Sequence, residues 1–154
     1  MSTASCRTTR PPRPPTVTDF DPTLALSTPP DDIDTVQDFV QRVLEPHTDI
    51  VGIDRISFET ALVELASNVI QHAAAGTGIT CVLSIHADDH ELSARISDSG
   101  AAGAVILSAP SFPDDLAESG RGLALIEMLV DSVHFERVAG RNVWTISRAR
   151  HPLP

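Results

Sequence analysis

The sequence contains no lysine, so all eleven basic residues of the 154-residue chain are arginines. The absence of lysine excludes a P-loop, in which a lysine reaches the terminal phosphates of a nucleotide. It also excludes Schiff-base chemistry on a lysine amine. A nucleotide enzyme built on this chain must therefore use backbone amides, arginine and a metal ion instead.

Cysteine and long apolar runs are scarce as well. The two cysteines, Cys6 and Cys81, do not form a disulfide framework, and this favours a reducing cytoplasm. No apolar run approaches the ~18 residues that are needed to span a bilayer. The basic N-terminal residues have no hydrophobic segment behind them, so we expect no secretory signal. The sequence thus predicts a cytoplasmic protein without a membrane partner.

The formal charge of −10 limits the kinds of partner that the chain can bind. A general nucleic-acid binder needs a basic face to neutralise phosphates, so nucleic acid is not expected as a direct partner. Residues 1–20 are rich in Pro, Thr, Ser and Arg, a composition that predicts a disordered tail. The remaining length suffices for one well-cored domain, which we place at residues 21–150.

Hydrophobic periodicity predicts the order of the secondary-structure elements. Alternation predicts strands at residues 23–27, 79–86 and 92–97, and a hairpin of residues 133–138 and 143–147 with Trp144 and Ile146 facing inward. Helical spacing predicts a helix capped by Asp31 or Asp32, a second helix from about residue 53 to residues 76–78, and a third over residues 123–130. The third helix is apolar nearly all round, so it is expected to be buried. This order predicts a two-layer α/β sandwich, in which a mixed, mostly antiparallel sheet carries its helices on one face.

Residues 58–75 carry the first chemical signal. At 100° per residue they present a broad apolar arc, wide enough to cover a sheet. Glu64, Asn68, Gln71 and His72 form a second stripe away from the centre of that arc. Alone, such a stripe is typical of a solvated helix face, and its meaning depends on the motifs that follow.

Asp98 is the second signal. If the alternation of Leu92, Ala94 and Ile96 continues by one step, Asp98 lies on the apolar face of its strand. A buried carboxylate is costly unless it has a partner. The alternative is an aspartate that forms a turn before Gly100.

The third signal is Gly120-Arg121-Gly122, which we expect to be a turn that opens the last helix, with Ser119 as its cap. Free amides at a helix N-terminus, together with the helix dipole, bind phosphate. Glycine lets a ligand approach the backbone closely. Alone, a G-x-G triplet is more often an ordinary turn.

Jointly, these motifs resemble those of the Bergerat-fold ATPases, the superfamily of gyrase, Hsp90, histidine kinases and the MutL repair proteins. ELASNVIQHA resembles the N box, DSGAAG the first glycine box and SGRGLAL the second. The short single-domain layout most resembles the anti-sigma-factor serine kinases. The resemblance covers roughly residues 23–148.

The resemblance implies binding of ATP and Mg²⁺. Asn68 would offer its amide oxygen to a Mg²⁺ that bridges the phosphates, and Glu64, one turn earlier, would be the general base for the attacking hydroxyl. Residues i and i+4 of a helix are neighbours, which suits this pair. Asp98 would accept a hydrogen bond from the adenine amino group.

The resemblance also implies roles for the glycine boxes. Gly100 and Gly103 would shape the base pocket, residues 101–119 would form a lid, and Gly120, Gly122 and Leu123 would contact the nucleotide. Arg121 would offset phosphate charge, or would be an exposed turn arginine. Two features depart from the family pattern: the second glycine of the first box is Gly103, with alanine at position 102, and the lid contains no basic residue.

The function implied most directly is that of a serine/threonine kinase and anti-sigma factor. It would phosphorylate an anti-sigma-factor antagonist protein, hold a sigma factor from RNA polymerase and form a homodimer. The alternative is a nucleotide-gated binding module without transfer activity, which the departures favour. The catalytic half of a histidine kinase is not expected, because no dimerising phosphoacceptor helix pair precedes the domain.

Overall fold

The computed structural model describes residues 22–73, 78–101 and 117–154, apart from the side chains of residues 72, 73 and 117–121. The expected disordered tail, Gly103 and most of the expected lid lie outside the described residues. So do the side chains of His72, Gly120 and Arg121.

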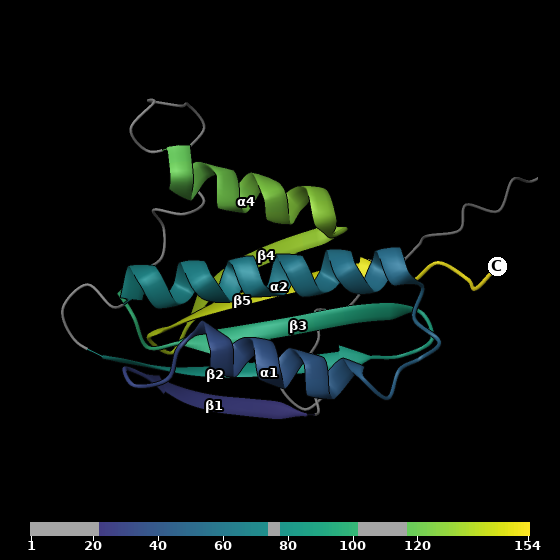
Figure 1. The fold of residues 1–154 in the computed structure, drawn as a ribbon. Helices are drawn as coiled ribbons and strands as arrows, with labels where there is room; N and C mark the ends of the chain where they lie inside the picture. The colour runs from purple at the N-terminus through teal and green to yellow at the C-terminus, as the bar shows by residue number, and fades with distance from the viewer. Residues whose placement is uncertain (1–21, 74–77, 102–116) are drawn as a thin grey trace, which may run out of the picture.

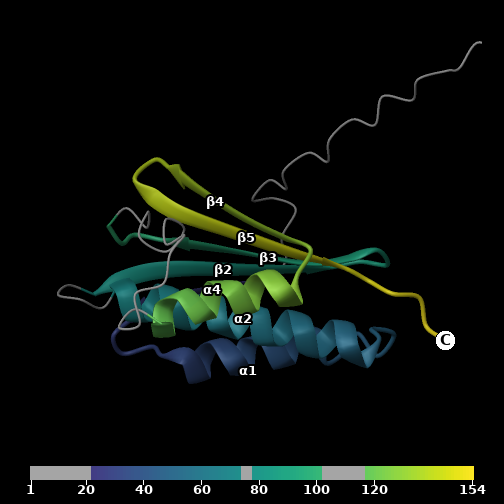
Figure 2. The ribbon, with the colours of Figure 1, turned by 90° about the horizontal axis from the view of Figure 1, so that it is seen from above.

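The elements follow one another in the predicted order, and their bounds are β1 (Thr23–Thr28), α1 (Ile33–Leu44), α2 (Gly52–Ala73), β2 (Ile79–Ala87), β3 (Glu91–Asp98), α4 (Ala117–Leu129), β4 (Ser132–Val138) and β5 (Arg141–Ala149). The strands form one sheet in the order β1-β2-β3-β5-β4. The helices that the structure describes, α1, α2 and α4, lie on the same face of this sheet (Figures 1 and 2). The predicted two-layer α/β sandwich is confirmed.

Every pairing between described strands is antiparallel. The sheet is therefore simpler than the mixed, mostly antiparallel sheet that the sequence suggested. Two of the pairs, β2–β3 and β4–β5, are hairpins and must be antiparallel. The helical connections place β1 at one edge, antiparallel to β2, and β4 at the other edge of the sheet.

The start of α1 settles a choice that the sequence left open. The Asp32 side chain accepts from the backbone N–H groups of Asp34 and Thr35, at 3.1 and 3.4 Å, and is therefore the N-cap. Asp31 instead accepts from the backbone N–H of Ser27 at 2.9 Å and closes the turn after β1.

The core lies between α2 and the middle of the sheet. Phe58, Leu62 and Leu65 of α2 are buried against the inward face, whose fully buried side chains include Leu83, Ile85, Leu92, Trp144 and Ile146. Burial of each such side chain contributes roughly 1.5–3 kcal/mol. Trp144 and Ile146 face inward, as predicted, and the ring of Trp144 lies 4.5 Å from that of Phe135 between centroids. The described part of the apolar arc, from Phe58 to Val69, thus covers the sheet as the sequence predicted.

Helix α4 differs from its prediction in two respects. It begins at Ala117, so Gly120 and Gly122 lie inside the helix and do not precede it. Alanine and glutamate at positions 117 and 118 are good helix formers, whereas each glycine inside the helix costs about 1 kcal/mol relative to alanine. The expected free amides at residues 120–122 are therefore not at the helix N-terminus.

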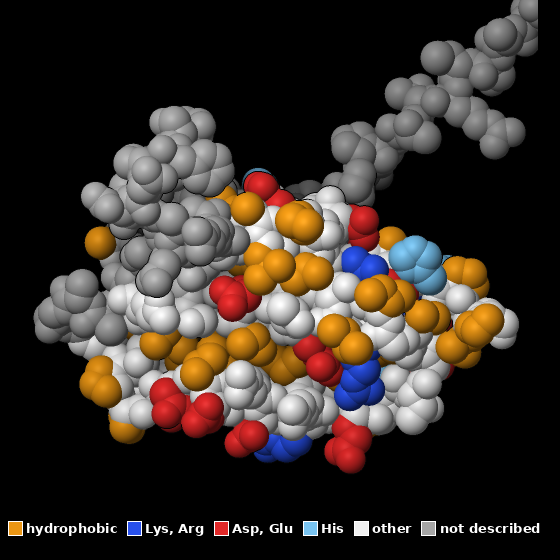
Figure 3. Space-filling view, turned by 45° about the horizontal axis from the view of Figure 1, so that its top comes forward, with side chains coloured by type: hydrophobic (Ala, Val, Ile, Leu, Met, Phe, Trp, Pro, Cys, Tyr) orange, Lys and Arg blue, Asp and Glu red, His pale blue; other side chains and the backbone are white. Residues whose placement is uncertain are grey.

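The expectation that α4 is buried all round is also wrong. Gly122 and Ile126 are buried, but Met128 is 81% exposed and Leu125 37% exposed. The helix packs beside α2 at the margin of the helical layer, and the described residues cover the side of α4 that faces α2 (Figure 1). Its apolar residues contribute to the apolar surface that is visible over the helical layer in the space-filling view (Figure 3).

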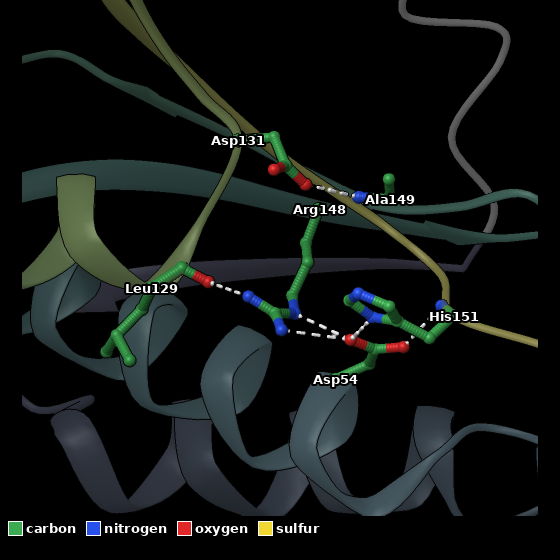
Figure 4. A network of polar contacts seen from close by, with 6 residues as sticks. All are labelled: Asp54, Leu129, Asp131, Arg148, Ala149 and His151. Carbon is green, nitrogen blue, oxygen red and sulfur yellow. Dashed lines mark hydrogen bonds and ion pairs between the residues drawn. The ribbon is translucent and has the colours of Figure 1, made fainter.

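A buried ionic network joins three elements at the N-terminal end of α2 (Figure 4). Asp54 is fully buried, and Arg148 contacts its Oδ1 through Nε at 3.0 Å and Nη2 at 2.9 Å. The His151 ring nitrogen Nδ1 lies 2.8 Å from the same oxygen, and the His151 backbone N–H donates to Oδ2 at 2.6 Å. Arg148 also donates to the Leu129 carbonyl at the end of α4, at 2.7 Å. The network therefore fastens α2, α4 and the end of β5 together.

Candidate nucleotide-binding site

Asp98 lies at the end of β3 and is 3% exposed, so the alternation argument placed its side chain correctly. Its Oδ1 accepts from the Gly100 backbone N–H at 2.8 Å and from Asn142 Nδ2 at 3.0 Å. The two interpretations of this aspartate, inward-facing and turn-forming, are both true. Within the described residues no hydrogen bond reaches Oδ2, so that oxygen is left to accept from a ligand.

Asn142 is the residue that sequence reasoning missed. It is 3% exposed and pairs with Asp98 across the β3–β5 ladder. Its Nδ2 also donates to the Ala101 carbonyl at 2.7 Å. A signal was present, because Asn142 alternates in phase with Trp144 and Ile146 and so lies on the inward face of its strand.

Two arginines of the β4–β5 hairpin contact the neighbours of this carboxylate. Arg137 donates from Nη1 to Asn142 Oδ1 at 2.8 Å and to the Gly100 carbonyl at 3.4 Å. Arg141 donates from Nε to Ser97 Oγ at 2.8 Å and from Nη2 to the carbonyls of Ser97 and Thr80. The hairpin thereby holds both the end of β3 and the residues that follow it.

Cys81 is the neighbour of Asp98 on the other side, across the β2–β3 ladder. Burial, and to a smaller extent the Asp98 carboxylate, raise the pKa of its thiol to about 12. Since thiolate is the reactive and metal-binding form, Cys81 is an inert wall of the site at neutral pH.

Asn68 and Gly122 bring the N box and the second glycine box into contact. A Cβ at Gly122 would lie 2.8 Å from Asn68 Nδ2, so only glycine lets α4 approach α2 so closely here. Asn68 is 9% exposed, and its buried Nδ2 has no hydrogen-bond partner among the described residues. A buried amide normally finds partners, so a ligand is the natural source of one.

Glu64 is half-buried, and its side chain lies on the side of α2 that faces α1. It lines a groove of about 340 Å³ between α1 and α2, together with Gln37, Val40, Gln41, Glu59, Thr60 and Val63. Helical spacing keeps Glu64 next to Asn68 on α2. The groove gives its carboxylate access to solvent from the α1 side.

The remaining predicted residues are placed less completely. Gly100 forms the turn after Asp98, and Leu123 is half-buried on α4. The backbone of Gly120 and Arg121 lies within α4, and Gly103 lies outside the described residues.

The residues that are present fit ATP and Mg²⁺. The free oxygen of Asp98 suits an amino donor, and the unpartnered amide of Asn68 can turn its oxygen toward a cation. The described residues hold no group of three or more His, Cys, Asp or Glu side chains that could cage a metal.

Comparison with known proteins identifies the fold and the family. The family model of the histidine kinase-like ATPase domain matches residues 26–148, which run from β1 to β5. Among solved structures, the chain is similar to the crystal structure of the RsbU and RsbW domains of Rv1364c from Mycobacterium tuberculosis. The identity is 19% and the TM-score 0.58, over 85% of this chain and 33% of that one.

This chain thus spans about a third of the solved chain, and the likeness shows a shared fold. A search of curated proteins gives no significant match. The matched segment holds the N box, both glycine boxes and Asn142. The chain belongs to the family of histidine kinase-like ATPase domains.

Proposed function

We propose that this protein is an ATP-dependent serine/threonine kinase and anti-sigma factor of the cytoplasm. Its substrate would be an anti-sigma-factor antagonist protein, its second partner a sigma factor, and its assembly a homodimer. The observation that carries the nucleotide part is a pair of buried polar groups with unused capacity, Asp98 Oδ2 and the Asn68 amide. The kinase part rests on Glu64, which a protein that only binds nucleotide does not need.

Each residue has a distinct task in this proposal. Asp98 accepts from the adenine amino group, and Asn68 orients the Mg²⁺, which supplies charge neutralisation at the phosphates when bound. Glu64 takes the proton of the acceptor hydroxyl as it attacks the γ-phosphoryl group. Its position on an open groove allows a protein substrate to reach it.

The glycine boxes complete the site. Gly100 and Gly103 shape the base pocket, and Gly120, Gly122 and Leu123 lie along the phosphates. Arg121 supplies the positive charge that lysine would supply elsewhere. Because α4 begins at Ala117, the amides free to bind phosphate are those of its first turn, before Gly120.

The test is phosphate transfer from γ-labelled ATP to candidate antagonist proteins by the wild type and by Glu64→Gln. We expect the variant to bind ATP normally and to transfer phosphate about 10²–10⁴ times more slowly, the usual loss on removal of a general base. Glu59→Gln is the matched control, because Glu59 lines the same groove five residues earlier and pairs with Arg55 at 3.0 Å. Equal transfer rates in all three proteins would show that Glu64 is not the base.

A nucleotide-gated binding module is the second candidate. The observation that favours it is the lid sequence, which offers no cation to the γ-phosphate. If the wild type binds ATP and a sigma factor but transfers no phosphate to any antagonist, the module replaces the kinase.

A further inference from the structure

The Asp98 carboxylate is held from one side only. Both hydrogen bonds that reach it from described residues end on Oδ1, and one of the two donors is the Asn142 amide. The position of Oδ2 therefore depends on the orientation of a neighbouring side-chain amide. No charged donor among the described residues contacts the carboxylate.

An asparagine amide has two nearly isosteric ends, and a rotation of 180° exchanges donor and acceptor. If the Asn142 amide rotated, its oxygen would face the Asp98 carboxylate, and two acceptors would repel each other. Arg137 opposes this rotation, because its guanidinium donates to Asn142 Oδ1 at 2.8 Å. The Ala101 carbonyl opposes it too, since it accepts from Nδ2 at 2.7 Å.

We propose that Arg137 and Asn142 are positioning residues for base selectivity. Arg137 fixes the Asn142 amide with its nitrogen toward Asp98, and Asn142 in turn holds Oδ1, so that Oδ2 meets the amino group of the base. The inference rests on the proposed role of Asp98 in adenine binding. It assigns a task to Arg137, an exposed arginine on β4 that lies outside the N box and both glycine boxes.

The alternative is that Arg137 and Asn142 only brace the hairpin. Bracing affects stability and the affinity for every nucleotide alike. Positioning of Oδ2 changes the preference for a base with an amino group over one with a carbonyl oxygen at that place. The ratio of ATP to GTP affinity therefore separates the two roles.

The experiment measures the affinities for ATP and GTP by calorimetry, with Mg²⁺ present, for the wild type, Arg137→Gln, Asn142→Leu and Arg141→Gln. Arg141→Gln is the matched control, since Arg141 lies on the same hairpin and contacts Ser97 and Thr80 but not the carboxylate. A hydrogen bond to a charged acceptor contributes enough that its loss should lower the ATP preference about tenfold in the first two variants. Arg141→Gln should keep the wild-type preference.

A pH profile of Asn142→Asp gives a second readout. This substitution places two carboxyl groups side by side, which raises the pKa of one of them. Its protonated form can donate to the other, so the ATP affinity of this variant should recover as the pH falls from about 8 to about 5. A loss caused by poor packing would not recover.

The outcomes separate the inference from the function on which it rests. If the wild type binds ATP and GTP equally, Asp98 does not read adenine, and both proposals fall. If the wild type prefers ATP and Arg137→Gln retains that preference, the function stands and the positioning role is wrong. Arg137 is exposed, so its variant should fold even if Asn142→Leu does not.

Discussion

Two aspartates of the described residues, Asp54 and Asp98, are buried near opposite ends of β5, and their hydrogen bonds differ. Asp54 is surrounded by charged and polar donors that use both of its oxygens. Asp98 receives only neutral donors from described residues, and all of them reach one oxygen. In the proposed function, Asp54 stabilises the fold, whereas the second oxygen of Asp98 accepts a hydrogen bond from the nucleotide.

The pKa of Asp54 reflects the hydrogen bonds that it accepts. Burial alone would raise the pKa, but the hydrogen bonds from the His151 amide, the His151 ring and Arg148 outweigh it, and the pKa is lowered from 3.8. The charged form of Asp54 is therefore favoured in the folded protein.

The largest expected effect is at the Asp54 end. Asp54→Asn leaves the Arg148 guanidinium, 14% exposed, without its anionic partner. Removal of one partner from a buried pair typically costs about 3–5 kcal/mol, so the free energy of unfolding should fall by that order in urea titrations. Asp131→Asn is the control, since Asp131 is an exposed carboxylate that binds the Ala149 amide beside the same network (Figure 4). Similar losses of stability in both variants would show that the buried Asp54 contributes no more than the exposed Asp131.

Gly122→Ala should have the next largest effect, at the other end of α2. The added methyl group would lie 2.8 Å from Asn68 Nδ2, and overpacking of this kind costs roughly 1–3 kcal/mol. The better helix propensity of alanine offsets about 1 kcal/mol of this cost, so the net loss should be at most about 2 kcal/mol. Thermal unfolding measures the loss. The double variant Gly122→Ala with Asn68→Ala removes the clash, so it should recover stability but not Mg²⁺-dependent ATP binding. No recovery of stability would mean that the strain lies elsewhere.

Asp98→Asn tests the carboxylate that is hydrogen-bonded through only one oxygen among the described residues. Its ATP affinity should fall about tenfold or more, because an amide can present a donor where the adenine amino group needs a charged acceptor. The loss of stability should be smaller than for Asp54→Asn, because no cation is left unpaired. Titration of ATP and urea unfolding of the same samples check both statements. A large stability loss with unchanged ATP affinity would reverse the roles of the two aspartates.

The smallest expected effect is the change of stability at acidic pH. Because the folded pKa of Asp54 is lowered, its contribution to stability is present above the ordinary value of 3.8 and is lost as the pH falls below it. The stability difference between the wild type and Asp54→Asn should be constant near neutral pH. Below pH 3.8 it should shrink, by up to about 1.4 kcal/mol per pH unit. A difference that stays constant in acid would show that Asp54 is not held as a carboxylate.

Local patterns in the sequence predicted most of this architecture. Alternation placed Asp98 and Trp144 on the inward face, and helical spacing placed Asn68 away from the centre of the apolar arc of α2. The same alternation argument applied to β5 would have found Asn142. These features depend on periodicity, which a sequence carries directly.

The features that were mispredicted or missed depend on tertiary contacts. The partner of Asp54 is Arg148, 94 residues away, and no local pattern connects them. The exposure of Met128 follows from the position of α4 at the margin of the layer, although its sequence is that of a buried helix. The early start of α4 reflects residues 117–119, which extend the helix ahead of the glycines.

Strand β5 links the two aspartates through its length. Asn142, Trp144, Ile146 and Arg148 share one face of the strand, with the polar partners outside and the two apolar side chains between them. A shift of register by one residue would turn all four to the other face and would undo both polar contacts at once. An insertion or deletion within β5 would therefore remove the Arg148–Asp54 ion pair and the Asn142–Asp98 hydrogen bond together. Changes in length can accumulate in the connecting loops, but this strand must keep its number of residues.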